Sequence, residues 1–230
     1  MGGRLVVVAG PIGNLSDLSP RAREELANAD GWFVEDTRIS GKLQTVLGVK
    51  KPMRTLNEHT TPRAVQAYVD EVAKDQTWAV LSDGGAPAIS DPGALLVDLA
   101  REDDIEVDAI PGPSAVTTAL MLSGFYAQRF AFLGFLPRKP GPMGRELEAY
   151  AESTLTLVVF ESPFRVRAFL EVAGKALPGR RYAICREMSK AHQQVFRAEL
   201  PIIPSEKEVP SKGEFTIVLE GKRSRDSGFG

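Results

Sequence analysis

Cysteine and histidine are scarce in this 230-residue sequence, which contains one cysteine and two histidines. A single cysteine, Cys185, excludes an internal disulfide and a cysteine-cluster metal site, and this usage fits the reducing cytoplasm. His59 and His192 lack the paired spacing of zinc ligands, so we expect no metal site. The longest apolar run, Leu5–Ala9, is far too short to cross a bilayer, so we expect a cytoplasmic protein without a membrane partner.

Several common binding signatures are also missing from the sequence. There is no G-x-G-x-x-G, the glycine-rich turn of dinucleotide-binding proteins and of the common methyltransferases. The phosphate-binding motif G-x-x-x-x-G-K-[ST] and the nucleophile elbow G-x-S-x-G are absent as well. A ligand site, if the chain has one, must therefore be built from other residues.

The chain has the composition of a soluble globular protein, with 43% hydrophobic and 25% charged residues. Its charge is unevenly distributed. Residues 1–123 contain 11 basic and 18 acidic side chains, whereas residues 124–223 contain 16 basic and 11 acidic ones. The basic second half suggests a polyanionic partner for that half.

The pattern of apolar runs predicts two domains, at residues 1–122 and 123–221, with residues 222–230 as a flexible tail. In the first domain, short apolar runs alternate with capped helices, which predicts an α/β fold with a mostly parallel, doubly wound sheet. The second domain is predicted to be mixed α+β with antiparallel pairing, a basic flexible loop at 138–142 and a helix at 145–151. The strands expected in the first domain are Leu5–Ala9, Gly31–Glu35, Met53–Leu56, Thr77–Leu81 and Glu106–Ile110.

Three strand ends, at Ala9, Ser82 and Ile110, open into loops of glycine, proline and small residues. Glycine allows the main chain to approach a ligand closely, and proline stiffens the loop, so the pattern predicts a preformed cleft lined by backbone. Asp83, in the loop that leads to the Asp91-Pro92 helix cap, suits a ligand hydroxyl or ammonium. Ser114 could either cap the following helix or meet the ligand.

Eight short motifs occur in the order typical of one family. The motifs are Pro11–Leu15, Glu35–Arg38, Ser82–Pro87 with Ser90–Gly93, Pro111–Ser114, Gly134–Pro137, Phe160–Pro163, Arg186-Glu187 with Lys190, and Lys212–Glu214. On these motifs the chain resembles the ribosomal RNA small subunit methyltransferase I family, within the tetrapyrrole methylase superfamily, over about residues 4–221.

The resemblance implies a two-domain tetrapyrrole-methylase-like fold that holds S-adenosylmethionine in the cleft between the domains. It also implies a homodimer that methylates a cytidine ribose 2′-hydroxyl in small-subunit ribosomal RNA, either free or in the assembled subunit. The cofactor-binding residues implied by motif position are Pro11, Ile12, Asp83, Ala86, Ser114, Ala115 and Phe160. The residues expected to bind RNA phosphates are Arg138, Lys139, Arg165 and Arg186.

Methyl transfer to a hydroxyl needs positioning and a route for the proton, but no metal. The catalytic candidates, among which the sequence does not choose, are Asp36, Arg38, His59, Glu161 and Lys190. Asp36 could instead be a helix N-cap, and His59 could be a surface residue. Asn57, Phe164 and Gln193 depart from the family pattern, and they leave the catalytic details and the RNA target open.

Two alternatives remain at this point. A relative with the same cofactor could methylate a tetrapyrrole or a protein side chain, although such an enzyme is expected to lack the Arg138-Lys139 and Glu35–Arg38 features. A non-catalytic ribosome-binding module with this fold would bind RNA regardless of S-adenosylmethionine.

Overall fold

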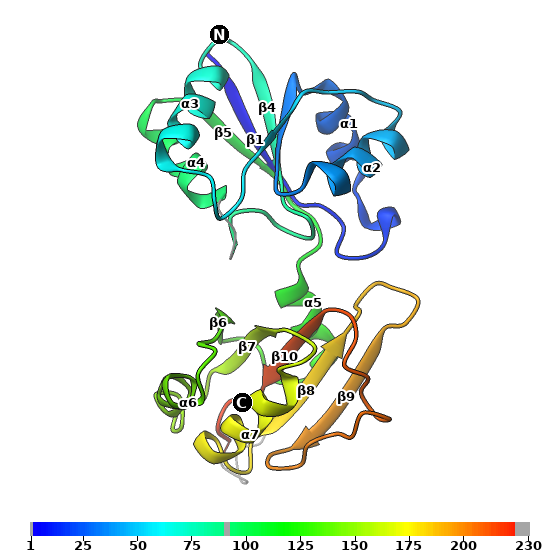
Figure 1. Ribbon diagram of the computed structural model, residues 1–230, viewed down its shortest axis with the longest axis vertical. Coiled ribbons are helices and arrows are strands. Elements are labelled where there is room, and N and C mark those ends of the chain that lie inside the picture. Colours follow the sequence, from blue (N-terminus) through cyan, green and yellow to red (C-terminus); the bar gives the residue numbers. More distant parts are fainter. Residues whose placement is uncertain (1, 90–92, 224–230) are drawn as a thin grey trace. The chain divides into compact units, whose positions relative to one another are not determined.

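The computed structural model describes residues 2–89 and 93–223 (Figure 1). The chain divides into two compact units, one ending at Ser114 and the other beginning at Ala115. Helix α5 (Ala115–Ser123) belongs to the second unit because it packs on that unit's strands, whereas the sequence pattern placed it in the first. The Asp91-Pro92 cap and residues 224–230 of the predicted tail lie outside the described residues.

The first unit is built around a parallel five-stranded sheet with the order β3-β2-β4-β1-β5, as the alternating pattern predicts. Its strands are β1 (Arg4–Val8), β2 (Gly31–Val34), β3 (Met53–Thr55), β4 (Thr77–Leu81) and β5 (Glu106–Ile110). Its helices are η1 (Leu15–Asp17), α1 (Pro20–Asn28), α2 (Thr37–Leu47), α3 (Pro62–Val72) and α4 (Gly93–Glu102).

Local sequence explains where these helices begin. The side chains of Ser19 and Thr61 accept backbone N–H groups at the starts of α1 and α3, and each is followed by proline at the first helical position. Helices α1 and α2 cover one face of the sheet, and α3 and α4 cover the other (Figure 1). Side chains along each strand alternate between the two cores, so that Trp32 packs toward α1 while Phe33 packs toward α3.

The second unit contains a mixed five-stranded sheet with the order β6-β7-β10-β8-β9. Strand β6 pairs with β7 in parallel, and the other pairs are antiparallel. Helices α6 and α7 pack on one face, and α5 lies on the other, where the Cys185 thiol is 3.7 Å from the Ala119 carbonyl. The elements are β6 (Phe130–Phe135), α6 (Pro140–Glu148), β7 (Thr156–Glu161), α7 (Val166–Ala176), β8 (Arg181–Arg186), β9 (Gln194–Glu199) and β10 (Phe215–Leu219).

The predicted basic loop at 138–142 is wrong in its second half. Pro140 is the first residue of α6 and Lys139 is its N-cap, so Gly141 and Pro142 form the first helical turn. Proline is tolerated in that turn because its missing N–H would have no partner inside the helix. No helix within residues 2–89 and 93–223 is both long and apolar enough to cross a membrane.

Candidate functional site

The carboxyl end of β4 lies at a switch point of the parallel sheet. Strand β4 runs between β1 and β2, and the helix after β4 covers one face while the helices after β1 and β2 cover the other. In open α/β sheets this divergence leaves a crevice at the strand ends, where ligands bind. The loop after β4 therefore occupies the centre of the candidate site.

The turns after β1, β4 and β5 meet at this edge of the sheet. The N–H of Gly10 donates to the carbonyl of Gly85 at 2.8 Å. Gly85 has a φ of +85°, and a Cβ added there would lie 3.2 Å from Ile12 Cγ2 and 3.6 Å from the Pro113 carbonyl oxygen. Glycine is favoured at Gly85 by both its backbone angle and this close approach. The convergence that the glycine and proline pattern predicts is thus present within the first unit.

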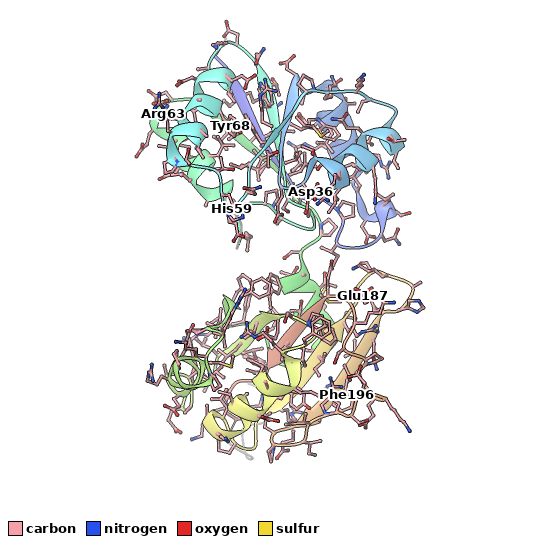
Figure 2. All side chains as sticks on the ribbon, viewed as in Figure 1. Asp36, His59, Arg63, Tyr68, Glu187 and Phe196 are labelled. Carbon is pink, nitrogen blue, oxygen red and sulfur yellow. The ribbon has the colours of Figure 1, made fainter. Side chains whose placement is uncertain are left out.

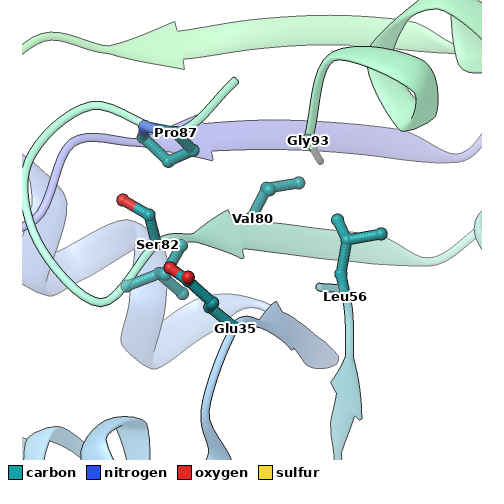
Figure 3. Close-up of a pocket in the computed structure, with 7 residues that line it drawn as sticks. Glu35, Leu56, Val80, Ser82, Pro87 and Gly93 are labelled. Carbon is teal, nitrogen blue, oxygen red and sulfur yellow. The ribbon is translucent and has the colours of Figure 1, made fainter. Parts of the chain in front are cut away.

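A small pocket opens on the β2–β3 side of the same loop (Figure 3). Its polar side chains are the carboxylate of Glu35 and the hydroxyl of Ser82, and the rest of its wall is apolar or main chain. None of the predicted cofactor residues lines this pocket, although Asp83 and Ala86 adjoin lining residues in the chain. The lining residues are Glu35, Leu56, Val80, Leu81, Ser82, Pro87 and Gly93.

The loops that follow β2 and β4 are joined by hydrogen bonds from backbone N–H groups to carboxylates. The N–H of Asp36 donates to Asp83 Oδ1 at 3.1 Å, and the N–H of Asp83 donates to Glu35 Oε2 at 3.2 Å. Partial burial of the carboxylate, followed by the negative charge of Glu35, raises the pKa of Asp83. A bound cation would relieve this repulsion, so the electrostatics favour a positively charged ligand.

Asp36 is the N-cap of α2. Its Oδ1 accepts the backbone N–H of Arg38 at 2.8 Å, and both of its carboxylate oxygens contact the Arg38 guanidinium. The hydrogen bonds from the Arg38 side chain and then from its backbone lower the pKa of Asp36 to about 2. This geometry gives Asp36 the capping role that the sequence left open, and a carboxylate with so low a pKa is a weak base.

The low pKa of Asp36 leads to a testable prediction about the stability of the protein in acid. Because the pKa of Asp36 falls from 3.8 to about 2 on folding, it contributes stability above pH 3.8 that is lost as the pH falls toward about 2. An Asp36→Asn variant keeps a good N-cap but removes this titration. We therefore expect its melting temperature to fall less steeply than that of wild type over this range, as measured by circular dichroism. An equal slope for the two proteins would contradict the assignment.

Glu161, at the end of β7, is a buried carboxylate in the second unit. Its Oε1 accepts the N–H of Ser162 at 2.7 Å, and its Oε2 lies 3.2 Å from Arg165 Nη2. That ion pair lacks hydrogen-bond geometry, so within the described residues Oε2 is buried with no hydrogen-bond partner. Burial raises the pKa of Glu161. Arg165 Nη2 also donates to the Pro137 carbonyl at 3.3 Å, so this predicted RNA contact is engaged inside the unit.

The predicted Arg186 is the last residue of β8, and the predicted Lys190 lies in the hydrogen-bonded turn that follows it. Lys190 Nζ contacts Glu187 Oε1 at 2.9 Å and Glu214 Oε2 at 3.0 Å, and these ion pairs raise the pKa of Lys190 against the opposing effect of burial. Arg186 Nε donates to the Lys212 carbonyl at 2.6 Å. Glu187, which the site prediction omitted, also accepts the Glu214 N–H at 2.9 Å. Glu187 follows Arg186 in the family motif, and this position is the sequence signal that could have identified it as a site residue.

The remaining predicted residues lie in three places. His59 is exposed in the loop between β3 and α3, in a different loop from Asp36 (Figure 2). Pro11, Ile12, Ala86 and Ser114 belong to the converging turns of the first unit, and Ala115 begins α5. Phe160 packs edge-on against Phe132 and Phe135 in the second unit, and Arg138 and Lys139 are exposed at the start of α6.

Comparison with known proteins identifies this architecture. Residues 4–203 match the family model described as Tetrapyrrole (Corrin/Porphyrin) Methylases. A solved uroporphyrin-III C-methyltransferase from Thermus thermophilus, complexed with S-adenyl homocysteine, has the same fold, with a TM-score of 0.65, 17% identity and coverage of 95% of this chain and 97% of that one. The chain therefore belongs to the tetrapyrrole methylases and is a methyltransferase that uses S-adenosylmethionine.

Closer relatives place the chain within one branch of that class. It is 39% identical over 222 residues to ribosomal RNA small subunit methyltransferase I of Thermotoga maritima, covering 96% of this chain and 99% of the relative. It is 41% identical over 222 residues to the protein of the same name from Mycobacterium tuberculosis, covering 95% and 78%. The chain belongs to the ribosomal RNA small subunit methyltransferase I family.

The residues of the first unit fit S-adenosylmethionine. A Cβ added at Gly10 would come no closer than 3.9 Å to the Gly85 carbonyl oxygen, and one at Gly84 no closer than 3.8 Å to the Pro11 carbonyl oxygen. Gly84 is exposed, so its main chain is accessible to a ligand, whereas Gly10 is buried and holds the Gly85 carbonyl. The adjacent carboxylates of Asp83 and Glu35 complement the sulfonium and ammonium charges of this cofactor.

Proposed function

We propose that this chain methylates the 2′-hydroxyl of a cytidine ribose in small-subunit ribosomal RNA, acting in the cytoplasm as a homodimer. The substrate is the free RNA or the assembled subunit. The observation that supports this most directly is the similarity, over nearly the whole chain, to relatives named for small-subunit ribosomal RNA. The basic second half of the sequence also supports it, because RNA backbones bind through Lys and Arg.

In this proposal the converging turns of the first unit hold the methyl donor. S-adenosylmethionine supplies a methyl carbon that its positive sulfur makes electrophilic. The main chain around Ile12, Ala86 and Ser114 contacts the nucleoside, and Asp83 binds a hydroxyl or the ammonium group. Ala115 and Phe160 complete the predicted cofactor set. Stiff turns lose little entropy on binding, so the cofactor is held in a defined orientation.

The hydroxyl proton must leave as the carbon–oxygen bond forms. We assign its acceptance to Glu161, because burial raises the pKa of this carboxylate despite the ion pair of its Oε2 with Arg165, and that oxygen has no hydrogen-bond partner within the described chain. Asp36 is paired with Arg38 and has a pKa of about 2, which suits it to orienting Arg38 rather than to accepting the proton. Lys190 supplies fixed positive charge, and exposed His59 remains a candidate contact to RNA.

The second unit is proposed to bind the RNA backbone. Arg138 and Lys139 are exposed and available to phosphates. Arg165 and Arg186 bond to carbonyl groups of their own unit, so they would contribute through positive potential and by fixing the loops.

Labelled S-adenosylmethionine tests this proposal. Purified protein is incubated with labelled cofactor and small subunits from a strain that lacks the enzyme, and in parallel with the naked RNA. We expect label in one RNA fragment, and nuclease digestion should place it on a cytidine ribose. Label on a base would contradict the 2′-hydroxyl assignment. Absence of label, with RNA binding unaffected by the cofactor, would support the non-catalytic binding module.

A further inference from the structure

Aromatic side chains are exposed at the carboxyl ends of β6 and β7. Phe135 is 64% exposed and Phe164 is 86% exposed, although a phenyl ring normally gains from burial. Phe160 packs edge-on against Phe135, with ring centres 5.7 Å apart and planes inclined by 60°. We call Phe135, Phe160 and Phe164 the aromatic rim. A rim of this kind offers flat apolar surface to a partner.

The rim is held by the strands and by one arginine. Phe135 is paired with Phe160 in the parallel ladder of β6 and β7, which lie side by side in Figure 1. Arg165 bridges the Glu161 carboxylate and the Pro137 carbonyl, so it ties the turn that carries Phe164 to the segment that follows Phe135. Because the turn is already ordered, presenting Phe164 to a ligand requires little further loss of entropy.

Positive charge follows Phe135 of the rim closely in the chain. Arg138 and Lys139 follow Phe135 by three and four residues, are exposed, and form no ion pair with any other residue in the described ranges. Exposed aromatic rings beside Lys and Arg are the combination that binds single-stranded RNA, because bases stack on the rings while phosphates meet the cations. A second protein surface would not by itself account for the adjoining charge.

We propose that the aromatic rim stacks an unpaired nucleobase of the RNA substrate, with Phe164 as the principal contact and Arg138 and Lys139 holding neighbouring phosphates. This inference rests on the proposed function and adds that the substrate is bound with a base out of its stack. It assigns a role to Phe164, one of the departures from the family pattern. Stacking is indifferent to base identity, so the rim contributes affinity and orientation rather than sequence choice.

Substitutions of Phe164 separate stacking from simple apolar contact. The probe is a fluorescent single-stranded RNA oligonucleotide containing cytidine, with its duplex as a comparison, measured by anisotropy at fixed salt concentration. We expect Phe164→Leu to weaken single-strand binding about 10-fold or more, and Phe164→Trp to restore it. Phe135→Leu should weaken binding in the same direction. Met121→Ala, at another exposed apolar position of the second unit (73% exposed), is the matched control and should bind like wild type.

Three results would overturn the inference. Phe164→Leu and Phe135→Leu could both bind like wild type, or Phe164→Trp could bind as weakly as Phe164→Leu. Sedimentation could also show that Phe164→Leu dissociates an oligomer, which would make the rim a contact with a second copy. These failures are distinguishable from failure of the proposed function: wild type that labels small subunits while Phe164→Leu labels them equally well rejects only the rim.

Discussion

Replacing Arg180 with methionine should destabilise the second unit by about 3 kcal/mol. Arg180 is buried, with 6% of its surface exposed. Its guanidinium donates from Nη1 to the Glu220 carbonyl at 2.8 Å. Its Nη2 lies 2.7 Å from the carbonyl oxygen of Tyr150 and 3.1 Å from those of Ala151 and Ser153. The carbonyls of Tyr150 and Ser153 also accept a backbone N–H and keep that hydrogen bond in the variant. The variant therefore leaves mainly the carbonyls of Glu220 and Ala151 without a donor. Each buried acceptor left without its donor costs about 1–3 kcal/mol.

Two probes locate the effect. Trp32 and Trp78, the only tryptophans, both lie in the first unit, so their fluorescence follows the unfolding of that unit, whereas far-ultraviolet circular dichroism follows both units. We expect the urea midpoint from circular dichroism to fall in Arg180→Met. Lys175→Met, which removes an exposed charge nearby in the chain, should change stability by no more than about 0.5 kcal/mol. Equal stabilities for the two variants would show that the carbonyl contacts of Arg180 contribute little.

This arginine illustrates the kind of feature that sequence patterns do not reveal. Arg180 contacts carbonyls 27 to 40 residues away in the chain, and Arg167 likewise contacts carbonyls of the 204–209 segment. Such bonds depend on which loops the fold brings together, and no local spacing encodes them. The same reason explains why Arg165 and Arg186 were predicted to face RNA. A basic side chain has the same sequence signature whether it binds phosphate or a carbonyl of its own chain.

The parallel sheet, in contrast, follows from local signals. Apolar strands such as Thr77–Leu81 and caps such as Ser19 and Thr61 each define an element without reference to distant residues. Once the strands are parallel, their carboxyl ends share one edge, so the convergence of the glycine and proline turns is a geometric consequence. The sequence analysis missed the start of α6 because Gly141 and Pro142 are typical of loops. Proline is also common at the first position of a helix, where Pro140 lies, but this signal was weaker than the loop signal of the next two residues.

Within the candidate site, the sequence identified the loops better than the roles of their side chains. Asp83 was assigned to a ligand, yet its Oδ1 also accepts the N–H of Asp36, a contact between two loops that are 47 residues apart. Glu35 was seen only as part of a motif, although it lines the pocket and bonds to Asp83. Which oxygen bonds to which N–H depends on how β2 and β4 are placed side by side, and this is a property of the assembled sheet.

An Asp83→Asn variant should bind S-adenosylmethionine about 10- to 100-fold more weakly than wild type, because a hydrogen bond to a charged group contributes about 1.5–3 kcal/mol. Asparagine retains an oxygen that can accept the Asp36 N–H, so the contact between the β2 and β4 loops is preserved while the charge is removed. Titration calorimetry with the cofactor and with S-adenosylhomocysteine measures the effect. Asp70→Asn, at an exposed position on α3, is the matched control and should bind normally.

The pH dependence of binding provides a second measurement of the same charge. Burial and Glu35 raise the pKa of Asp83 in the free protein, so protonation removes the charge at a higher pH than for an ordinary aspartate. Wild-type affinity for the cationic cofactor should therefore decline as the pH falls through that raised pKa, and Asp83→Asn should lack this decline.

Stability distinguishes a ligand-binding charge from a structural one. Because a raised carboxyl pKa means that ionisation of Asp83 opposes folding as the pH rises, Asp83→Asn at neutral pH should be as stable as wild type or slightly more stable. Weaker cofactor binding together with retained stability would show that the Asp83 carboxylate serves cofactor binding rather than folding. Functional groups often reduce stability in this way. If the variant is instead less stable and binds the cofactor normally, Asp83 serves the loop contact with Asp36, and its assignment to the cofactor is wrong.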